Sequence, residues 1–163
     1  TPLAKVGNNC SLSWDIGFED VFVPDDAVLG EVGKGFSILR NTLKYARAGL
    51  AASVTGVAQA AVDCALAHAR ERRQFGRSIG SFQTISHRLA DMQTAVDLSR
   101  LMVGKLAWSI DQGEDCTRLA AQAKLVATET LHRVTDDGMQ IMASAGYAAE
   151  SGIIARDLGL TED

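Results

Sequence analysis

The absence of proline after Pro24 is the feature that most constrains what this 163-residue chain can form. Proline fixes φ and lacks a backbone N–H, so it ends or kinks helices. Residues 25–163 contain no proline, so no proline interrupts a helix in this part of the chain. A hydrophobic content of 47% with 22% charged residues is typical of a soluble globular domain rather than of a disordered chain. The length suits one domain with a sizeable core, and we expect that domain to be helical.

Residues 82–112 show the clearest helical pattern. At alternating spacings of three and four, eight of nine positions are apolar: Phe82, Ile85, Leu89, Met92, Val96, Ser99, Val103, Leu106 and Ile110. This spacing is typical of a helix that packs lengthwise against other helices. We expect a helix here.

Three further helices are predicted, over residues 36–72, about 117–143 and about 148–158. The second of them has a narrow face of small and aliphatic residues that suits close helix approach: Ala120, Ala123, Ala127, Leu131, Val134, Gly138 and Ile141. Asp115 or Thr117 can cap the start of this helix, because a side-chain oxygen can accept a hydrogen bond from a free N–H group of the first turn. The predicted fold class is all-α, an antiparallel four-helix bundle.

The beginning of the chain follows a different period. Leu12, Trp14, Ile16 and Phe18 alternate with small or polar residues, which is the pattern of a half-buried strand. A lone strand needs partners, so we expect residues 1–23 to be the tail of a preceding β domain. Residues 24–35 are rich in turn-forming residues and form the expected linker, and residues 36–163 form the helical bundle.

Charge and cysteine content narrow the class of protein further. The formal net charge of −4 argues against nucleic-acid binding, which usually needs a basic surplus. The odd number of cysteines, three, with no CxxC pair fits free thiols in a reducing compartment. The longest uncharged stretch, Ala48–Val62, is shorter than a bilayer requires, so no membrane span is expected.

Four arginines fall within eight residues between the first two predicted helices, at Arg70, Arg72, Arg73 and Arg77. Guanidinium groups make bidentate contacts with phosphates, and Ser81 could cap the helix that follows, so the loop is a candidate pyrophosphate site. A solvated basic turn is the alternative, because cations are favourable at a helix C-terminus.

Several spaced motifs in this sequence resemble those of the acyl-CoA dehydrogenase family. The segment Arg72-Arg73-Gln74-Phe75-Gly76, followed by Phe82-Gln83, is similar to the family signature "R-x-Q-F-G … F-Q". The earlier segments 18–24 and 29–36 resemble the family's "F-D-V-x-V-P … L-G-x-x-G-x-G-F". Gln140-Ile141-Met142, Gly146-Tyr147 and Arg156-Asp157 match later landmarks in order, so the resemblance covers roughly residues 5–158.

The resemblance implies an FAD-dependent enzyme that removes hydrogen from the α and β carbons of an acyl-CoA thioester. It places Arg72 on the FAD pyrophosphate of a neighbouring subunit, and it places substrate contacts at Lys44 and Arg47 on the first helix. The other FAD contacts implied are Gln74, Phe75, Gln83, Gln140, Ile141, Met142, Ala143 and Ser144. No metal site is implied. A homotetramer or homodimer is expected, with an electron-transfer flavoprotein as electron acceptor, in a bacterial cytoplasm or a mitochondrial matrix.

The sequence departs from the family pattern at the catalytic base and beside the cofactor. The usual base is a Glu in a "Y-E-G-T" segment, and the nearest carboxylate here, Glu162, has no Gly-Thr after it. The alternative base position of some members, directly before Arg47, holds Ala46. Ala143 and Ser144 stand where the family usually has two glycines, and larger side chains there can crowd the FAD contact.

Three functions therefore stay open from the sequence alone. The first is a fragment of an acyl-CoA dehydrogenase, which alone would be inactive. The second is a non-catalytic assembly domain or partner subunit of the same fold. The third is a flavoprotein relative with oxidase-type chemistry, because a fold does not fix its reaction.

Overall fold

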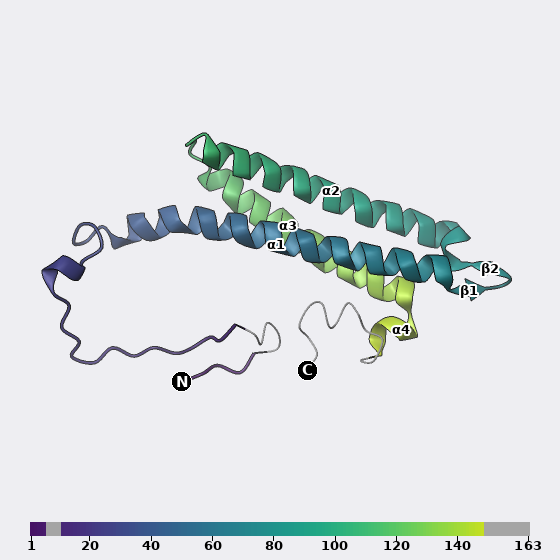
Figure 1. The fold of residues 1–163 in the computed structure, drawn as a ribbon, viewed down its shortest axis with the longest axis horizontal. Helices are drawn as coiled ribbons and strands as arrows, with labels where there is room; N and C mark the ends of the chain where they lie inside the picture. The colour runs from purple at the N-terminus through teal and green to yellow at the C-terminus, as the bar shows by residue number, and fades with distance from the viewer. Residues whose placement is uncertain (6–10, 149–163) are drawn as a thin grey trace.

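The computed structural model describes residues 1–5 and 11–148, and three long helices dominate it (Figure 1). The helices are α1 (Gly35–Glu71), α2 (Gln83–Asp111), α3 (Thr117–Met142) and the short α4 (Ser144–Tyr147). Two 3-10 turns, η1 (Asp25–Ala27) and η2 (Ile79–Ser81), and two short strands, β1 (Arg73–Gln74) and β2 (Arg77–Ser78), complete the described elements. The long helices run side by side as an elongated bundle, and the N-terminal segment lies apart from them.

The bounds of the three long helices agree with the predicted ranges to within one residue, and the helical fold class is confirmed. The helix predicted over 148–158 falls almost entirely outside the described residues. Before it lies α4, a single turn that the sequence did not predict. Ser81 does not cap α2, because its hydroxyl donates to the Ser78 carbonyl (2.7 Å) and the N-cap position is Phe82.

The core follows the seams that the sequence predicted. All nine positions of the 82–110 pattern are buried or half-buried, with Met92, Val96 and Leu106 fully enclosed. The predicted small-residue face of α3 is likewise buried against α1, whose own buried face consists largely of alanines: Ala51, Ala58, Ala61, Ala65 and Ala69. Because alanine side chains are short, α1 and α3 pack closely along their length.

Ser99, the one polar residue of the α2 seam, has a hydrogen-bond partner across the core. Its hydroxyl lies 2.8 Å from that of Thr55 on α1, and the Thr55 hydroxyl also donates to the Ala51 carbonyl (2.7 Å). Both side chains are buried. Since a buried hydroxyl without a partner costs roughly 1–3 kcal/mol, this pair fixes the register of α1 against α2.

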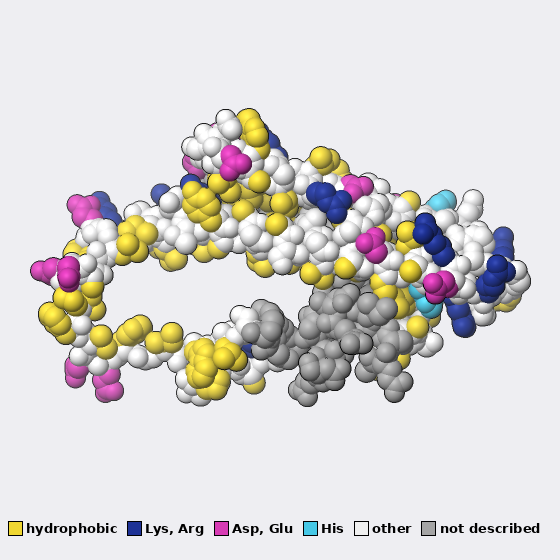
Figure 2. Space-filling model, viewed as in Figure 1, with side chains coloured by type: hydrophobic (Ala, Val, Ile, Leu, Met, Phe, Trp, Pro, Cys, Tyr) yellow, Lys and Arg dark blue, Asp and Glu magenta, His cyan; other side chains and the backbone are white. Residues whose placement is uncertain are grey.

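The N-terminal segment forms no sheet in the described part of the chain. Pro2 and Trp14 make one isolated antiparallel bridge, and the alternating apolar side chains of residues 12–18 are exposed rather than half-buried. Figure 2 shows hydrophobic side chains gathered along this segment. A strand with one bridge lacks the neighbouring strands that bury one of its faces. The division at residues 23 and 35 into β tail, linker and bundle stays a prediction.

One described helix, α1, is long and apolar enough by length and composition to cross a bilayer. Core helices of soluble bundles pass the same test, and the alanine face of α1 packs against α3 and α2. The helix is therefore weak evidence for a membrane span.

Candidate functional site

The predicted arginine loop is a β-hairpin that projects from one end of the bundle (Figure 1). Strands β1 and β2 pair antiparallel, with Arg73 opposite Ser78 and Gln74 opposite Arg77. Phe75 and Gly76 form the two-residue turn, with φ values of +53° and +79°. Turns with two positive φ values suit the twist of a hairpin, and Asn-Gly usually fills them. A phenylalanine in the first of these positions carries strain of order 1–3 kcal/mol, which points to a functional role.

Phe75 stands almost free at the tip of the hairpin, with 93% of its surface exposed. Its only described ring contact is edge-on to Phe82, at 6.2 Å between centroids, and the Arg77 guanidinium lies 4.0 Å from the Phe82 centroid. Phe82 and Arg77 thus brace the base of the hairpin. The tip presents an aromatic surface that nothing in the described chain covers.

Arg72 begins the hairpin at the end of α1. Its N–H donates to the His68 carbonyl (2.9 Å) and its carbonyl accepts from the Ile79 N–H (2.9 Å). These two hydrogen bonds fix the backbone of Arg72. Its exposed guanidinium makes no hydrogen bond or ion pair to any described residue. A fixed backbone with a free guanidinium fits a phosphate contact from outside this chain.

The second predicted FAD segment, residues 140–144, lies at the same end of the bundle (Figure 1). Gln140, Ala143 and Ser144 are exposed, but Ile141 and Met142 are buried at 3% and 5% exposure. The Cys64 thiol donates to the Met142 sulfur at 3.8 Å. The side chains of Ile141 and Met142 therefore belong to the bundle core, which leaves only their backbone for any cofactor contact.

Ala143 joins α3 to α4 in a backbone conformation that favours glycine, with φ +49° and ψ −128°. The residue therefore stores strain at the edge of the candidate site. Gly146, three residues on, meets a different constraint: a Cβ there would lie 3.1 Å from the Met142 Cβ and 3.2 Å from the Met139 carbonyl oxygen. A side chain at position 146 would therefore require its neighbours in this corner to shift by a few tenths of an ångström.

Replacing Ala143 by glycine is expected to stabilise the protein by about 1 kcal/mol, because glycine adopts positive φ without a Cβ clash. The midpoint of thermal unfolding should rise accordingly. The matched control is Ala145→Gly inside α4, which should destabilise because glycine is a poor helix former. A loss of stability in Ala143→Gly would contradict the strain assigned to this residue.

The predicted substrate residues Lys44 and Arg47 are half-buried near the start of α1. At 1.5 Å per helical residue, Lys44 lies roughly 40 Å along α1 from Arg72. The structure therefore does not bring the substrate candidates and the hairpin together within one chain. The role that the resemblance implies for Arg72, on a cofactor held by a neighbouring subunit, stays a prediction.

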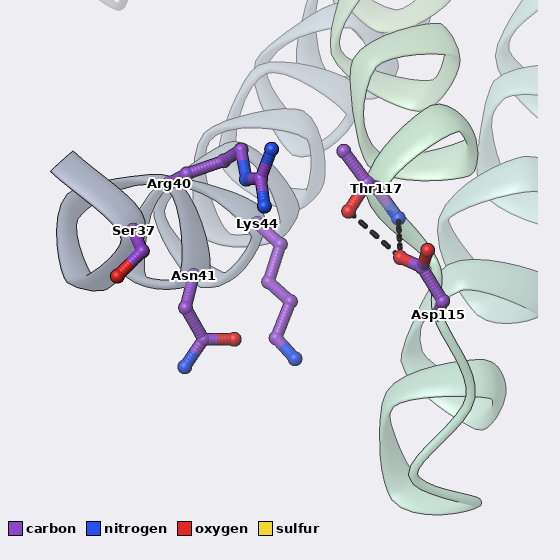
Figure 3. A pocket seen from close by; sticks show the side chains of 6 residues that line it. All are labelled: Ser37, Arg40, Asn41, Lys44, Asp115 and Thr117. Atoms are coloured by element: carbon purple, nitrogen blue, oxygen red, sulfur yellow. Dashed lines mark hydrogen bonds between the residues drawn. The ribbon is translucent and has the colours of Figure 1, made fainter. Parts of the chain in front are cut away.

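Lys44 lines a cleft of about 390 Å³ between the start of α1 and the start of α3 (Figure 3). Its polar walls were not predicted as a unit: Ser37, Arg40, Asn41 and Lys44 come from one face of α1, and Asp115 and Thr117 lie opposite. The signal in the sequence was a run of basic residues on α1, which has no acidic residue before Asp63.

Asp115 organises the far wall of this cleft. Its Oδ1 accepts from the Thr117 hydroxyl (2.8 Å) and from the Thr117 N–H (3.1 Å), whereas the N-cap position of α3 is Cys116 rather than the predicted Asp115 or Thr117. These two hydrogen bonds, and after them the positive charges of Lys44 and Arg40, lower the pKa of Asp115 below its usual 3.8. Because the folded pKa is depressed, the stabilisation is present above the ordinary pKa and is lost as pH falls through the folded value.

Thr117→Val is expected to move the pKa of Asp115 back toward its ordinary value, and Lys44→Gln should do so less. The reason is that the hydroxyl hydrogen bond is the larger cause of the shift. Carboxyl chemical shifts followed by NMR through acid pH measure both effects. A larger rise in Lys44→Gln than in Thr117→Val would reverse the assigned order of causes.

The candidate base Glu162 lies outside the described residues. Ala46, at the alternative base position, supplies no carboxylate. The base therefore stays unassigned in the described part of the chain.

Comparison with known proteins gives one consistent family. A sequence model described as "Acyl-CoA dehydrogenase, C-terminal domain" matches residues 33–158. The chain is 43% identical to a probable acyl-CoA dehydrogenase of Bacillus subtilis, over 99% of this chain and 43% of the relative. It is 40% identical to the mitochondrial short-chain specific acyl-CoA dehydrogenase of Bos taurus, over 90% of this chain and 35% of the relative.

Among solved structures, the chain resembles butyryl-CoA dehydrogenase from Megasphaera elsdenii with a TM-score of 0.93 and 38% identity, over 98% of this chain and 42% of that one. The chain thus spans about two-fifths of the length of such relatives. Sequence, fold and the order of the motifs agree, and the chain belongs to the acyl-CoA dehydrogenase family, whose C-terminal helical domain it forms.

Proposed function

We propose that the protein containing this chain is an FAD-dependent dehydrogenase of acyl-CoA thioesters. The observation that carries the proposal is the hairpin, which holds an exposed, unpaired Arg72 beside the strained and exposed Phe75. Strained residues are retained where function requires them, and a free guanidinium is suited to a pyrophosphate. The family membership supplies the class of reaction to which this geometry belongs.

The described residues fit a flavin cofactor at the hairpin end of the bundle. Arg72, Gln74, Phe75 and Gln83 offer exposed donors and an aromatic surface, and the corner at Ala143–Ser144 lies at the same end. A solved FAD complex of PigA resembles this chain with a TM-score of 0.81 and 30% identity, which supports the choice of cofactor. None of these groups encloses a cofactor alone, so we propose that they complete a site shared with another subunit.

The proposed reaction removes the α proton of the thioester with a carboxylate base, while the β hydrogen leaves as a hydride. FAD, when bound, accepts that hydride. This chain would contribute Arg72 for anchoring and Lys44 and Arg47 on the substrate side. The base itself is proposed to lie beyond the described residues, with Glu162 as the candidate.

Two partners follow from the same proposal. A chain in a solved structure of the electron transferring flavoprotein of Acidaminococcus fermentans resembles this chain, with a TM-score of 0.91 and 35% identity. We propose an electron-transfer flavoprotein as the electron acceptor of the whole protein. A homotetramer or homodimer would bring the hairpin of one subunit to the cofactor of another. The buried free thiol of Cys116 supports a reducing compartment, a bacterial cytoplasm or a mitochondrial matrix.

The test is the visible absorption spectrum of the purified full-length protein, before and after anaerobic addition of mixed acyl-CoA esters. A flavin spectrum that bleaches establishes the dehydrogenase half-reaction. Bound flavin that stays oxidised contradicts the proposed substrate class, and absence of flavin contradicts the cofactor and favours a non-catalytic assembly role. Rapid reoxidation of the reduced flavin by oxygen would assign oxidase-type chemistry instead.

A further inference from the structure

The chain connects α2 and α3 at one end only. Residues 112–116 form the short turn that joins the end of α2 to the start of α3. At the other end the two helices lead into different segments, the hairpin before α2 and the α3–α4 corner (Figure 1). That open end carries Gln83 and residues 140–144, which are candidate cofactor contacts from the two helices. Their relative placement therefore depends on contacts between α2 and α3 themselves.

An ion pair between Arg88 and Asp137 makes such a contact at the open end. The Arg88 Nη1 donates to the Asp137 Oδ1 at 2.8 Å, and both side chains are half-buried. Arg88 stands five residues after Gln83, and Asp137 stands three residues before Gln140. Roughly 35 Å of helix separates Arg88 from the end of α2 at Asp111, so the turn there gives this end little restraint.

Both members of this ion pair pass over a candidate partner on their own helix. Asp91 lies three residues after Arg88 on α2, and Arg133 lies four residues before Asp137 on α3. These are the spacings at which opposite charges meet on a helix surface. Neither of these local ion pairs is formed, and the two side chains instead reach across to the neighbouring helix.

The apolar contacts beside the ion pair restrict the two helices less sharply. The core at this end consists of alanines and aliphatic side chains, against which the half-buried Ile85, Leu89 and Leu131 pack. Hydrophobic attraction has no preferred direction, whereas a charge-assisted hydrogen bond has a preferred length and angle. Between described residues, this is also the one ion pair that joins two different elements. It therefore sets the position of α2 along α3 at the open end.

We propose that Arg88 and Asp137 are positioning residues for the cofactor site. Their ion pair holds the start of α2 against the end of α3, so that Gln83 and residues 140–144 keep the placement that a bound flavin requires. Neither side chain contacts the cofactor itself in this proposal, which rests on the proposed function. A site with loose supporting residues binds its ligand less tightly, because binding must then also restrict their movement.

The test compares the FAD affinity of the full-length wild-type protein with that of Arg88→Gln, Asp137→Asn and the double variant. The apoprotein is titrated with FAD by the change in flavin fluorescence, at a temperature where circular dichroism shows every variant folded. We expect each single variant to bind FAD about fivefold more weakly, a limit set by the strength of a half-exposed ion pair. The double variant should lose no more than the larger single loss, because either substitution breaks the same interaction. Arg88→Lys keeps the charge and should retain most of the affinity.

The matched control is Arg100→Gln, which breaks the ion pair of Arg100 with Asp97 within α2 (3.2 Å). Arg100 also donates to the Gln59 side chain on α1 (2.9 Å), so this control likewise removes a contact between two helices. Arg100 lies twelve residues beyond Arg88, which is roughly 18 Å further from the open end. The control should lower the unfolding temperature about as much as Arg88→Gln does, but it should leave FAD affinity unchanged.

A purely structural role would lower the unfolding temperature of Arg88→Gln while its FAD affinity stayed at the wild-type value. That result, or an equal loss of FAD affinity in Arg88→Gln and Arg100→Gln, overturns the inference alone when the wild-type protein binds FAD and bleaches with acyl-CoA. A wild-type protein without flavin refutes the proposed function and this inference with it. Bound flavin that fails to bleach refutes only the proposed reaction, and the FAD affinities of the variants still decide the inference.

Discussion

Arg72→Ala in the full-length protein should weaken FAD binding about tenfold to a hundredfold, because it removes a charge-assisted contact to a pyrophosphate. Helix content should not change, since the exposed Arg72 side chain makes no hydrogen bond or ion pair to a described residue and its backbone hydrogen bonds survive in alanine. Flavin absorbance retained after gel filtration, with circular dichroism of the same sample, measures both quantities.

The control for this variant is Arg73→Ala, one residue further along the same hairpin and also exposed. It removes the same charge from the same structure, so a general electrostatic effect would appear in both variants. Equal loss of FAD from both would show that the hairpin acts only through its net charge. A collapse of helix content in Arg72→Ala with FAD still bound would show that its role is structural.

Leu106→Ala should cost about 3 kcal/mol of unfolding free energy, the middle of the range for an enclosed leucine. Leu106 is fully buried on α2, and it packs into the cluster formed with Ala51, Ala120 and Ala123. The small residues around it cannot expand to fill the cavity that truncation leaves. Thermal unfolding followed by the helical signal gives the loss of stability.

Leu101→Ala provides the matched comparison, because it makes the same substitution on the same helix at 70% exposure. Its expected cost is within about 0.5 kcal/mol. Equal destabilisation by the two variants would show that the core defined by this chain alone does not determine its stability, and that another surface covers Leu101.

The helices were predictable because the buried face of a helix requires apolar residues at a spacing of three and four along the sequence. The 82–110 pattern identified the seam of α2 position by position, and it included Ser99, whose polarity is explained only by Thr55 on another helix. The short residues of α3 indicated close approach without naming the partner helix, which is α1. Periodicity reports which face is buried but not what covers it.

The hairpin and the α3–α4 corner were harder to predict because each contains a non-glycine residue with a positive φ. Phe75 and Ala143 have positive φ values, which a reader of the sequence expects at glycine or asparagine. The interval between β1 and β2 therefore resembled an ordinary loop. Family resemblance named the positions in both places, but it did not distinguish the exposed Ala143 from the buried Ile141 and Met142.

The uninterrupted course of α1 fixes a distance within the molecule. Its 37 residues make a rod of roughly 55 Å, with the basic cleft near one tip and the arginine hairpin at the other. A stiff rod of that length acts as a spacer, so no small molecule spans both tips of one subunit. A ligand that binds at one tip is therefore remote from the other tip of the same helix, and ligands at the two tips can be assayed as independent variables.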